Sequence, residues 1–176
     1  MHIHSGPAAC DRPHPGRIRC PTMSQLKVGL VGSGGISHSH APHWVTLGAD
    51  VRVFSLVGAD ELAEEFGLTV ADTREELFEW ADVVDICTPT RTHAEIALAA
   101  IAVGTHVLCE KPLGRTTDEA RAVAAATRAA GVQVYPAHVV RYFPEYVALH
   151  AAVADGKIGI PAVLRFSRGR QAVATR

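Results

Sequence analysis

Short, mostly apolar runs alternate with longer helical patterns along the chain from residue 26 to residue 154. Runs of this length, apolar at nearly every position, are typical of strands covered on both faces of a sheet. Alternation of such strands with helices predicts a parallel sheet with helices on both sides, the doubly wound α/β fold class. The expected strands are residues 26–31, 51–54, 83–87, 106–109 and 132–135.

Three sequence patterns of the capping-box type mark helix starts between these strands. In each, a threonine precedes a glutamate by three positions, an arrangement in which both side chains satisfy free backbone N–H groups. Gly131 has the residue type expected at a helix end, where a left-handed backbone is needed. The three boxes are Thr73–Glu76, Thr92–Glu95 and Thr116–Glu119.

The charge balance and composition exclude several classes of protein. With 17 Lys+Arg against 18 Asp+Glu, the formal charge is −1, so the chain lacks the basic surface that a nucleic-acid partner requires. No apolar run approaches the length of about 20 residues that spans a bilayer, so we expect no membrane partner. The 4 cysteines are too few for a disulfide scaffold, which favours a reducing compartment and a cytoplasmic location.

The chain divides into three parts by pattern. Residues 1–22 are proline-rich without hydrophobic periodicity, so we expect a disordered leader that is not native, with Met23 as the true start. Residues 23–155 form the α/β domain. Residues 156–176 are expected to begin a second domain, with Pro161–Ser167 as its first strand and the rest truncated.

A glycine-rich segment, Gly32-Ser33-Gly34-Gly35-Ile36-Ser37, joins the first expected strand to the first helix. Glycines at this position permit a tight turn and close approach to a pyrophosphate, while the helix N-terminus supplies N–H groups. Gly32, Gly34, Gly35 and Ile36 are therefore candidate cofactor-binding residues. The alternative is a turn in which the glycines serve backbone geometry alone.

The end of the second expected strand does not settle which dinucleotide would bind. NAD-binding domains commonly place an acidic residue there to bind the ribose 2′-hydroxyl. Here the strand runs into Phe54-Ser55-Leu56-Val57, and Ser55 faces either a hydroxyl or a 2′-phosphate. The cofactor is therefore predicted as NAD or NADP, with Ser55 among its contacts.

The histidines and cysteines predict no metal site. His38 and His40 lie on different faces of the expected helix, so only His40 and His43 could bind the same metal ion. We interpret these histidines as capping groups or cofactor contacts. Cys87 and Cys109 follow strand patterns and are read as small core residues.

The segments with the most chemical information follow two later strands. The first is Thr88-Pro89-Thr90 with His93, and the second is Glu110-Lys111-Pro112, which contributes one of the three lysines of the chain. Both segments fall at the carboxyl edge of the sheet, where this fold class binds ligands. The alternative for Lys111 is a surface ion pair with Glu110, which would contribute little.

Together these residues resemble the glucose–fructose oxidoreductase / inositol dehydrogenase / rhizopine-catabolism (Gfo/Idh/MocA) family over residues 26–170. The resemblance implies a Rossmann cofactor domain, with the glycine segment at the pyrophosphate. It implies further that Thr88, Pro89 and His93 line the nicotinamide side and that Glu110 contacts the nicotinamide ribose. Arg141, within His138–Pro144, would reach toward the nicotinamide end.

The resemblance also assigns a catalytic residue and a substrate class. Lys111 would act at the substrate oxygen, next to a cis peptide before Pro112, and the substrate would be a sugar, polyol or related hydroxyl compound. Full-length relatives are expected to form homo-oligomers, whereas this shorter chain is compatible with a monomer. The leading hypothesis is an NAD(P)-dependent oxidoreductase that is incomplete as given.

Two other functions fit parts of the same pattern. A non-catalytic dinucleotide-binding module, or a gene fragment, would retain the glycine segment without turnover. A methyltransferase would also use a glycine-rich loop, but its chemistry needs no lysine at the carboxyl edge of the sheet.

Overall fold

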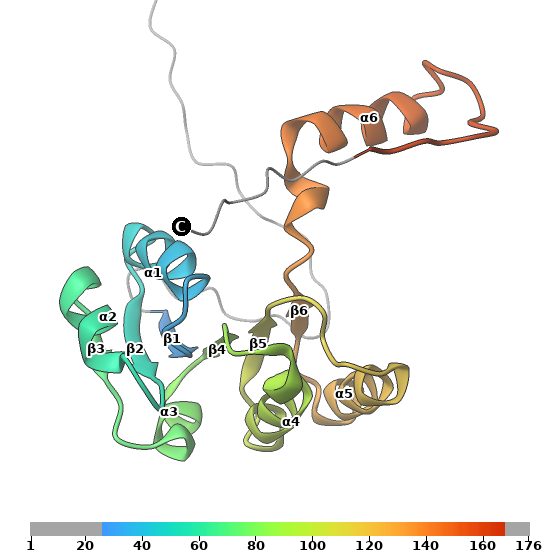
Figure 1. The fold of residues 1–176 in the computed structure, drawn as a ribbon. Helices are drawn as coiled ribbons and strands as arrows, with labels where there is room; N and C mark the ends of the chain where they lie inside the picture. The colour runs from blue at the N-terminus through green and yellow to red at the C-terminus, as the bar shows by residue number, and fades with distance from the viewer. Residues whose placement is uncertain (1–25, 168–176) are drawn as a thin grey trace, which may run out of the picture. The chain divides into compact units, whose positions relative to one another are not determined.

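The computed structural model describes residues 26–167 of the chain (Figure 1). By its internal contacts the chain forms two compact units, with the boundary between Ala137 and His138. The predictions for residues 1–22, including Met23 as the start, lie outside the described residues. The boundary expected near residue 155 lies inside the second unit.

The first unit is built on a six-stranded parallel sheet in the order β3-β2-β1-β4-β5-β6. This order reverses between β1 and β4, as in a doubly wound Rossmann fold, and so confirms the predicted class. The strands are β1 (Lys27–Val31), β2 (Asp50–Phe54), β3 (Thr69–Val70), β4 (Val83–Ile86), β5 (His106–Cys109) and β6 (Val134–Pro136).

Helices cover both faces of this sheet (Figure 1). Helices α1 and α2 pack on one face, around Leu30, Val53 and Leu62. Helices α3, α4 and α5 pack on the other, around Val84, Ile101 and Val107. The helices of the first unit are α1 (Ser37–Thr46), α2 (Ala59–Phe66), α3 (Arg74–Trp80), α4 (His93–Ala102), which follows the 3-10 turn η2 (Thr90–Thr92), and α5 (Thr117–Ala130).

Two of the three predicted capping threonines cap their helices. The Thr73 and Thr116 side chains accept hydrogen bonds from the backbone N–H groups of Glu76 and Glu119. The prediction for Thr92 is wrong, because the preceding 3-10 turn already places this residue in a helical conformation. Its hydroxyl instead donates to Thr88 Oγ1 at 2.8 Å and lies 2.9 Å from the carbonyl oxygen of Pro89.

The second unit contains the 3-10 turn η3 (Val139–Tyr142) and helix α6 (Pro144–Ala154). The strand expected over Pro161–Ser167 is not formed, because no other strand of the described residues pairs with it. Within this unit the Phe166 ring instead stacks on Tyr146 at 6.1 Å between centroids. No helix among residues 26–167 has the length and apolar content needed to cross a membrane.

Candidate functional site

The glycine segment leaves the sheet where the strand order reverses, between β1 and β4. Gly32 has φ +108°, and a side chain there would place its Cβ 2.9 Å from the carbonyl oxygen of Cys87. Both features require glycine at this position. Gly32 therefore allows the chain to turn closely past the end of β4 and into α1.

Gly34 and Gly35 are glycines for a different reason. A Cβ at either residue would meet no atom within 4 Å, so these positions face open space rather than protein. Among the described residues, no acceptor pairs with the backbone N–H groups of Ser33, Gly34, Gly35 and Ile36. A loop with free N–H groups at a helix N-terminus, and no side chains to obstruct approach, fits a pyrophosphate.

This loop forms one wall of a cavity of about 840 Å³, within the size range of small-molecule sites. The ends of β2 and β4 form other walls. Seven of the residues predicted from the sequence line this cavity: Gly32, Gly34, Gly35, Ile36, Ser55, Thr88 and Pro89. Lining residues that the sequence analysis did not select include Leu56, Val57, Arg74 and Arg91.

Ser55 belongs to a small hydroxyl cluster at the end of β2. The Ser33 hydroxyl donates to Ser55 Oγ at 3.1 Å, and Ser55 donates in turn to the carbonyl oxygen of Val57 at 2.8 Å. The cluster links the glycine segment to the turn after β2, and no carboxylate occupies the strand end. The wall nearest this strand end therefore presents neutral hydroxyls and carbonyls beside the apolar residues Leu56 and Val57.

His93 connects the two segments that the sequence analysis singled out. Its side chain is buried, with Nε2 2.8 Å from the Thr88 carbonyl oxygen and Nδ1 2.7 Å from the Pro112 carbonyl oxygen. The ring therefore ties the end of β4 to the turn that follows β5. Its two polar atoms face backbone, so the geometry gives His93 a positioning role.

Glu110, Lys111 and Pro112 follow β5 directly, and the Lys111–Pro112 peptide is cis, as expected. Glu110 is largely buried, and its Oε2 accepts a hydrogen bond from the Lys111 backbone N–H at 3.1 Å. The Lys111 side chain is 60% exposed, with Nζ 3.9 Å from the same Oε2. The amine is thus held loosely by the carboxylate and remains open to solvent.

Arg141, the last predicted site residue, lies in η3 of the second unit. Its predicted role at the nicotinamide end stays a prediction.

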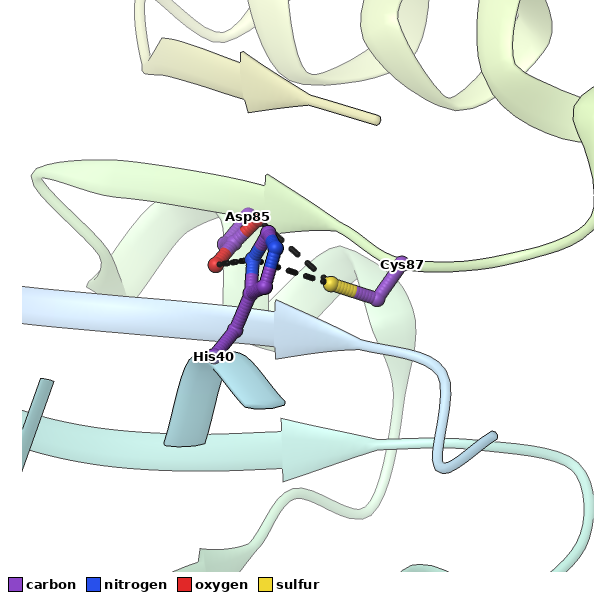
Figure 2. Close-up of side chains that lie close together, drawn as sticks. All are labelled: His40, Asp85 and Cys87. Carbon is purple, nitrogen blue, oxygen red and sulfur yellow. Dashed lines mark hydrogen bonds and ion pairs between the residues drawn. The ribbon is translucent and has the colours of Figure 1, made fainter. Parts of the chain in front are cut away.

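The structure adds a buried polar network that the sequence analysis did not assemble (Figure 2). Asp85 of β4 is completely buried and accepts hydrogen bonds from Trp44 Nε1 at 2.7 Å and His40 Nδ1 at 2.9 Å, both from α1. The other ring nitrogen of His40 lies 3.5 Å from Glu110 Oε1. The hydrogen bond to Asp85 raises the pKa of His40 against the opposing effect of burial, and the negative charge of Glu110 adds to the rise.

His40, Asp85 and Cys87 are also residue types that bind metal ions, and their donor atoms lie within 4.8 Å of one another. The Cys87 sulfur lies 3.4 Å from His40 Nδ1 and 3.6 Å from Asp85 Oδ1. Burial and the Asp85 charge raise the pKa of Cys87 far above its ordinary value, and burial raises that of Cys109 to about 12. Hydrogen bonds among the three side chains account for their closeness.

The parallel sheet in this order, the glycine turn with free N–H groups and the cavity at the carboxyl edge define a dinucleotide-binding Rossmann domain. The profile of the Gfo/Idh/MocA oxidoreductase family, described as having an NAD-binding Rossmann fold, matches residues 26–138. The chain belongs to this family.

Several of the similar proteins are sugar or polyol dehydrogenases. Inositol 2-dehydrogenase of Klebsiella pneumoniae is 33% identical over 158 residues, which cover 84% of this chain and 47% of that protein. An apo scyllo-inositol dehydrogenase from Lactobacillus casei superposes with a TM-score of 0.72 at 25% identity, covering 79% of this chain and 44% of that one. A levoglucosan dehydrogenase in complex with NADH and levoglucosan gives 0.71 at 30% identity, with 76% and 40% covered.

This chain therefore spans less than half the length of the relatives named above. The part that the family profile matches, residues 26–138, is described as an NAD-binding Rossmann fold.

Proposed function

We propose that this chain is the cofactor-binding part of an NAD(P)-dependent oxidoreductase that transfers a hydride between nicotinamide and a hydroxyl carbon of a sugar or polyol. The observation that carries the proposal is the presence of two features at one edge of the sheet. A loop with free N–H groups follows β1, and the Glu110–Lys111 pair follows β5. The sugar and polyol dehydrogenases among the similar proteins support the substrate class.

Each end of the dinucleotide would have its own contacts. The N–H groups of Ser33–Ile36 would bind the pyrophosphate, and the adenosine ribose would lie against Ser55 at the end of β2. Thr88 and Pro89 line the cavity beyond β4, where the nicotinamide would lie, and Glu110 would accept a hydrogen bond from its ribose. When bound, the nicotinamide ring supplies or accepts the hydride.

Lys111 is proposed to handle the proton that accompanies this transfer. Oxidation of an alcohol removes a hydride from carbon and a proton from oxygen, and a neutral lysine amine can accept that proton. In the reverse direction the ammonium returns a proton to the oxygen. The exposed amine beside Glu110 can reach a substrate while the carboxylate limits its position.

The dinucleotide is proposed to be either NAD or NADP, with little discrimination at the adenosine ribose. The hydroxyls of Ser33 and Ser55 can contact a 2′-hydroxyl or a 2′-phosphate. The strand end has no carboxylate, so nothing there would repel the phosphate. Arg74, Glu75 and Arg91 line the same cavity. Arg74 is paired with Glu75 at 3.3 Å and with Glu95 at 3.0 Å, so the cation proposed to favour a 2′-phosphate is Arg91. A cytoplasmic location and the oligomeric state stay predictions from the sequence.

The test is a fluorescence titration of the 176-residue chain with NADH and NADPH, followed by turnover assays with a panel of polyols and sugars. We expect the wild type and Lys111→Ala to bind both cofactors saturably. For each cofactor, the affinities of the two proteins should agree within about threefold. Any turnover of the wild type should be lost in Lys111→Ala.

Other results of this test point to different functions. Binding without turnover would support the non-catalytic dinucleotide-binding module for this length of chain. Absence of binding to either cofactor would overturn both functions, and full turnover by Lys111→Ala would remove the catalytic role of that residue.

A further inference from the structure

The imidazole of His40 lies between two carboxylates that belong to different strands. Nδ1 is 2.9 Å from Asp85 Oδ2 on β4, and Nε2 is 3.5 Å from Glu110 Oε1, immediately after β5. The side chains are 15%, 0% and 9% exposed, in the order His40, Asp85 and Glu110. Carboxylate oxygens only accept hydrogen bonds, so a ring that carries both protons satisfies both contacts at once.

The charged and titratable groups around His40 can be named from each neighbouring element. Asp85 faces it from β4, and Cys87 faces it from the position after that strand. Glu110 faces it from the end of β5, with Lys111 one residue further. Helix α2 also packs on α1, but its Glu65 pairs with His38 at 3.3 Å instead. The two carboxylates therefore dominate, and a cationic ring neutralises negative charge that would otherwise be buried.

Through its position in the chain, His40 connects Glu110 to the glycine loop. Helix α1 begins at Ser37, directly after the glycine loop, and His40 lies one turn into it. The same short helix thus carries the proposed pyrophosphate site at its start and the partner of Glu110 one turn later. Glu110 in turn accepts from the Lys111 backbone through its other oxygen at 3.1 Å.

We propose that cationic His40 is a positioning residue, which holds the Glu110 carboxylate, and through it Lys111, at a fixed place relative to the glycine loop. This inference rests on the proposed function, because Glu110 acquires a binding role only when a dinucleotide is present. Loss of the charge on His40 leaves Asp85 and Glu110 without a shared cation. Of these two carboxylates, only Glu110 has access to solvent. Glu110 then leaves its place, and the contact with the nicotinamide ribose weakens.

The experiment separates the two ends of the dinucleotide. Binding of NADH and of ADP is measured by calorimetry from about pH 5.5 to about pH 9, a range that covers histidine titration. ADP ends at the second phosphate, so it reports the glycine loop without the nicotinamide ribose. For the wild type we expect NADH affinity to fall as His40 loses its proton, relative to the ADP affinity measured at the same pH.

Two variants complete the design. His40→Gln should bind NADH about 10-fold more weakly than wild type near pH 6, the size expected for loss of a hydrogen bond between charged groups. Its affinity for ADP should change less than about twofold, and its NADH affinity should lose the pH dependence that His40 contributes. The control is His43→Gln. Although the sequence suggested His43 as a capping group or cofactor contact, the structure leaves it exposed and outside the residues that line the cavity, so this variant should match the wild type throughout.

NMR titration of the wild-type imidazoles provides a readout that needs no variant. The His40 resonance should titrate above the ordinary histidine pKa, and NADH should hold it in the cationic form to still higher pH. The proposal is overturned if the NADH affinity of His40→Gln depends on pH as that of the wild type does. It is also overturned if His40→Gln loses NADH and ADP affinity equally, which would indicate a purely structural role. If the wild type binds neither NADH nor ADP, the proposed function itself fails.

Discussion

Gly32 and the carbonyl of Cys87 approach so closely that no side chain fits between them. A Cβ on Gly32 would lie 2.9 Å from that oxygen, and the backbone has φ +108°. The contact joins the end of β1 to the end of β4, the two strands between which the strand order reverses. The place where the cofactor would lie is therefore set by main-chain contact rather than by side-chain packing.

Gly32→Ala is expected to destabilise the protein by about 2 kcal/mol or more, because the substitution adds both backbone strain and overlap with Cys87. Gly35→Ala is the matched control, since its Cβ would meet no protein atom. We expect Gly35→Ala to retain stability and to weaken NADH binding, since its methyl group would occupy the space of the pyrophosphate. Chemical denaturation and NADH titration measure the two effects, and equal stability of the two variants would contradict the explanation.

Ser55→Asp should make the site selective for NADH. A carboxylate at the end of β2 can accept a hydrogen bond from a 2′-hydroxyl and would repel a 2′-phosphate. We expect the ratio of NADPH to NADH affinity to fall by about 10-fold or more, equivalent to about 1.4 kcal/mol. Ser55→Ala removes the hydroxyl without adding charge and should leave the ratio nearly unchanged; an unchanged ratio in Ser55→Asp would place the adenosine ribose elsewhere.

Ser37 is fully buried, and among the described residues its hydroxyl has no hydrogen-bond partner. The hydroxyl faces the Cys87 thiol without reaching hydrogen-bond geometry. Removing an unsatisfied buried hydroxyl should stabilise the fold, so we expect Ser37→Ala to raise the free energy of unfolding by about 1 kcal/mol. Ser39→Ala, exposed on the same helix, corrects for helix propensity. Equal changes in the two variants would show that burial of the hydroxyl carries no cost.

The stability of the protein should decrease as the pH rises past the ordinary histidine range. His40 has its pKa raised above 6.5 in the folded protein, so the folded state binds this proton more tightly than the unfolded state. The resulting stabilisation is complete below pH 6.5 and is lost as the pH rises through the folded pKa. Urea denaturation at a series of pH values measures this slope, and His40→Gln should lack it, whereas His43→Gln should keep it.

The sequence predicts the sheet well because its strands carry strong local signals. Val51–Phe54 and His106–Cys109 are apolar runs between helical patterns, and both are strands in the structure. The two-residue strand Thr69–Val70 is exposed and has no such signal. The run Pro161–Ser167 shows the opposite case, since a strand-like pattern forms no strand when no partner supplies hydrogen bonds.

The candidate site, like the sheet, was predictable from the sequence only in part. The glycine loop is visible in the sequence because three glycines follow an apolar strand pattern, the first of them, Gly32, being required by the backbone geometry. Thr88 and Pro89 likewise follow a strand end. The His40–Asp85 pair connects residues that are 45 positions apart, so no local pattern could reveal it. One signal was present: Asp85 is an acid inside an apolar strand, and a buried carboxylate requires partners.

The His93 ring, whose two nitrogens face the carbonyl oxygens of Thr88 and Pro112, has a consequence for the thermodynamics of ligand binding. The segments after β4 and β5 are joined through one buried side chain, so they are ordered together when the domain folds. Binding of a ligand that touches both segments therefore loses little conformational entropy in ordering them relative to each other. Folding has already organised this side of the site before any cofactor arrives.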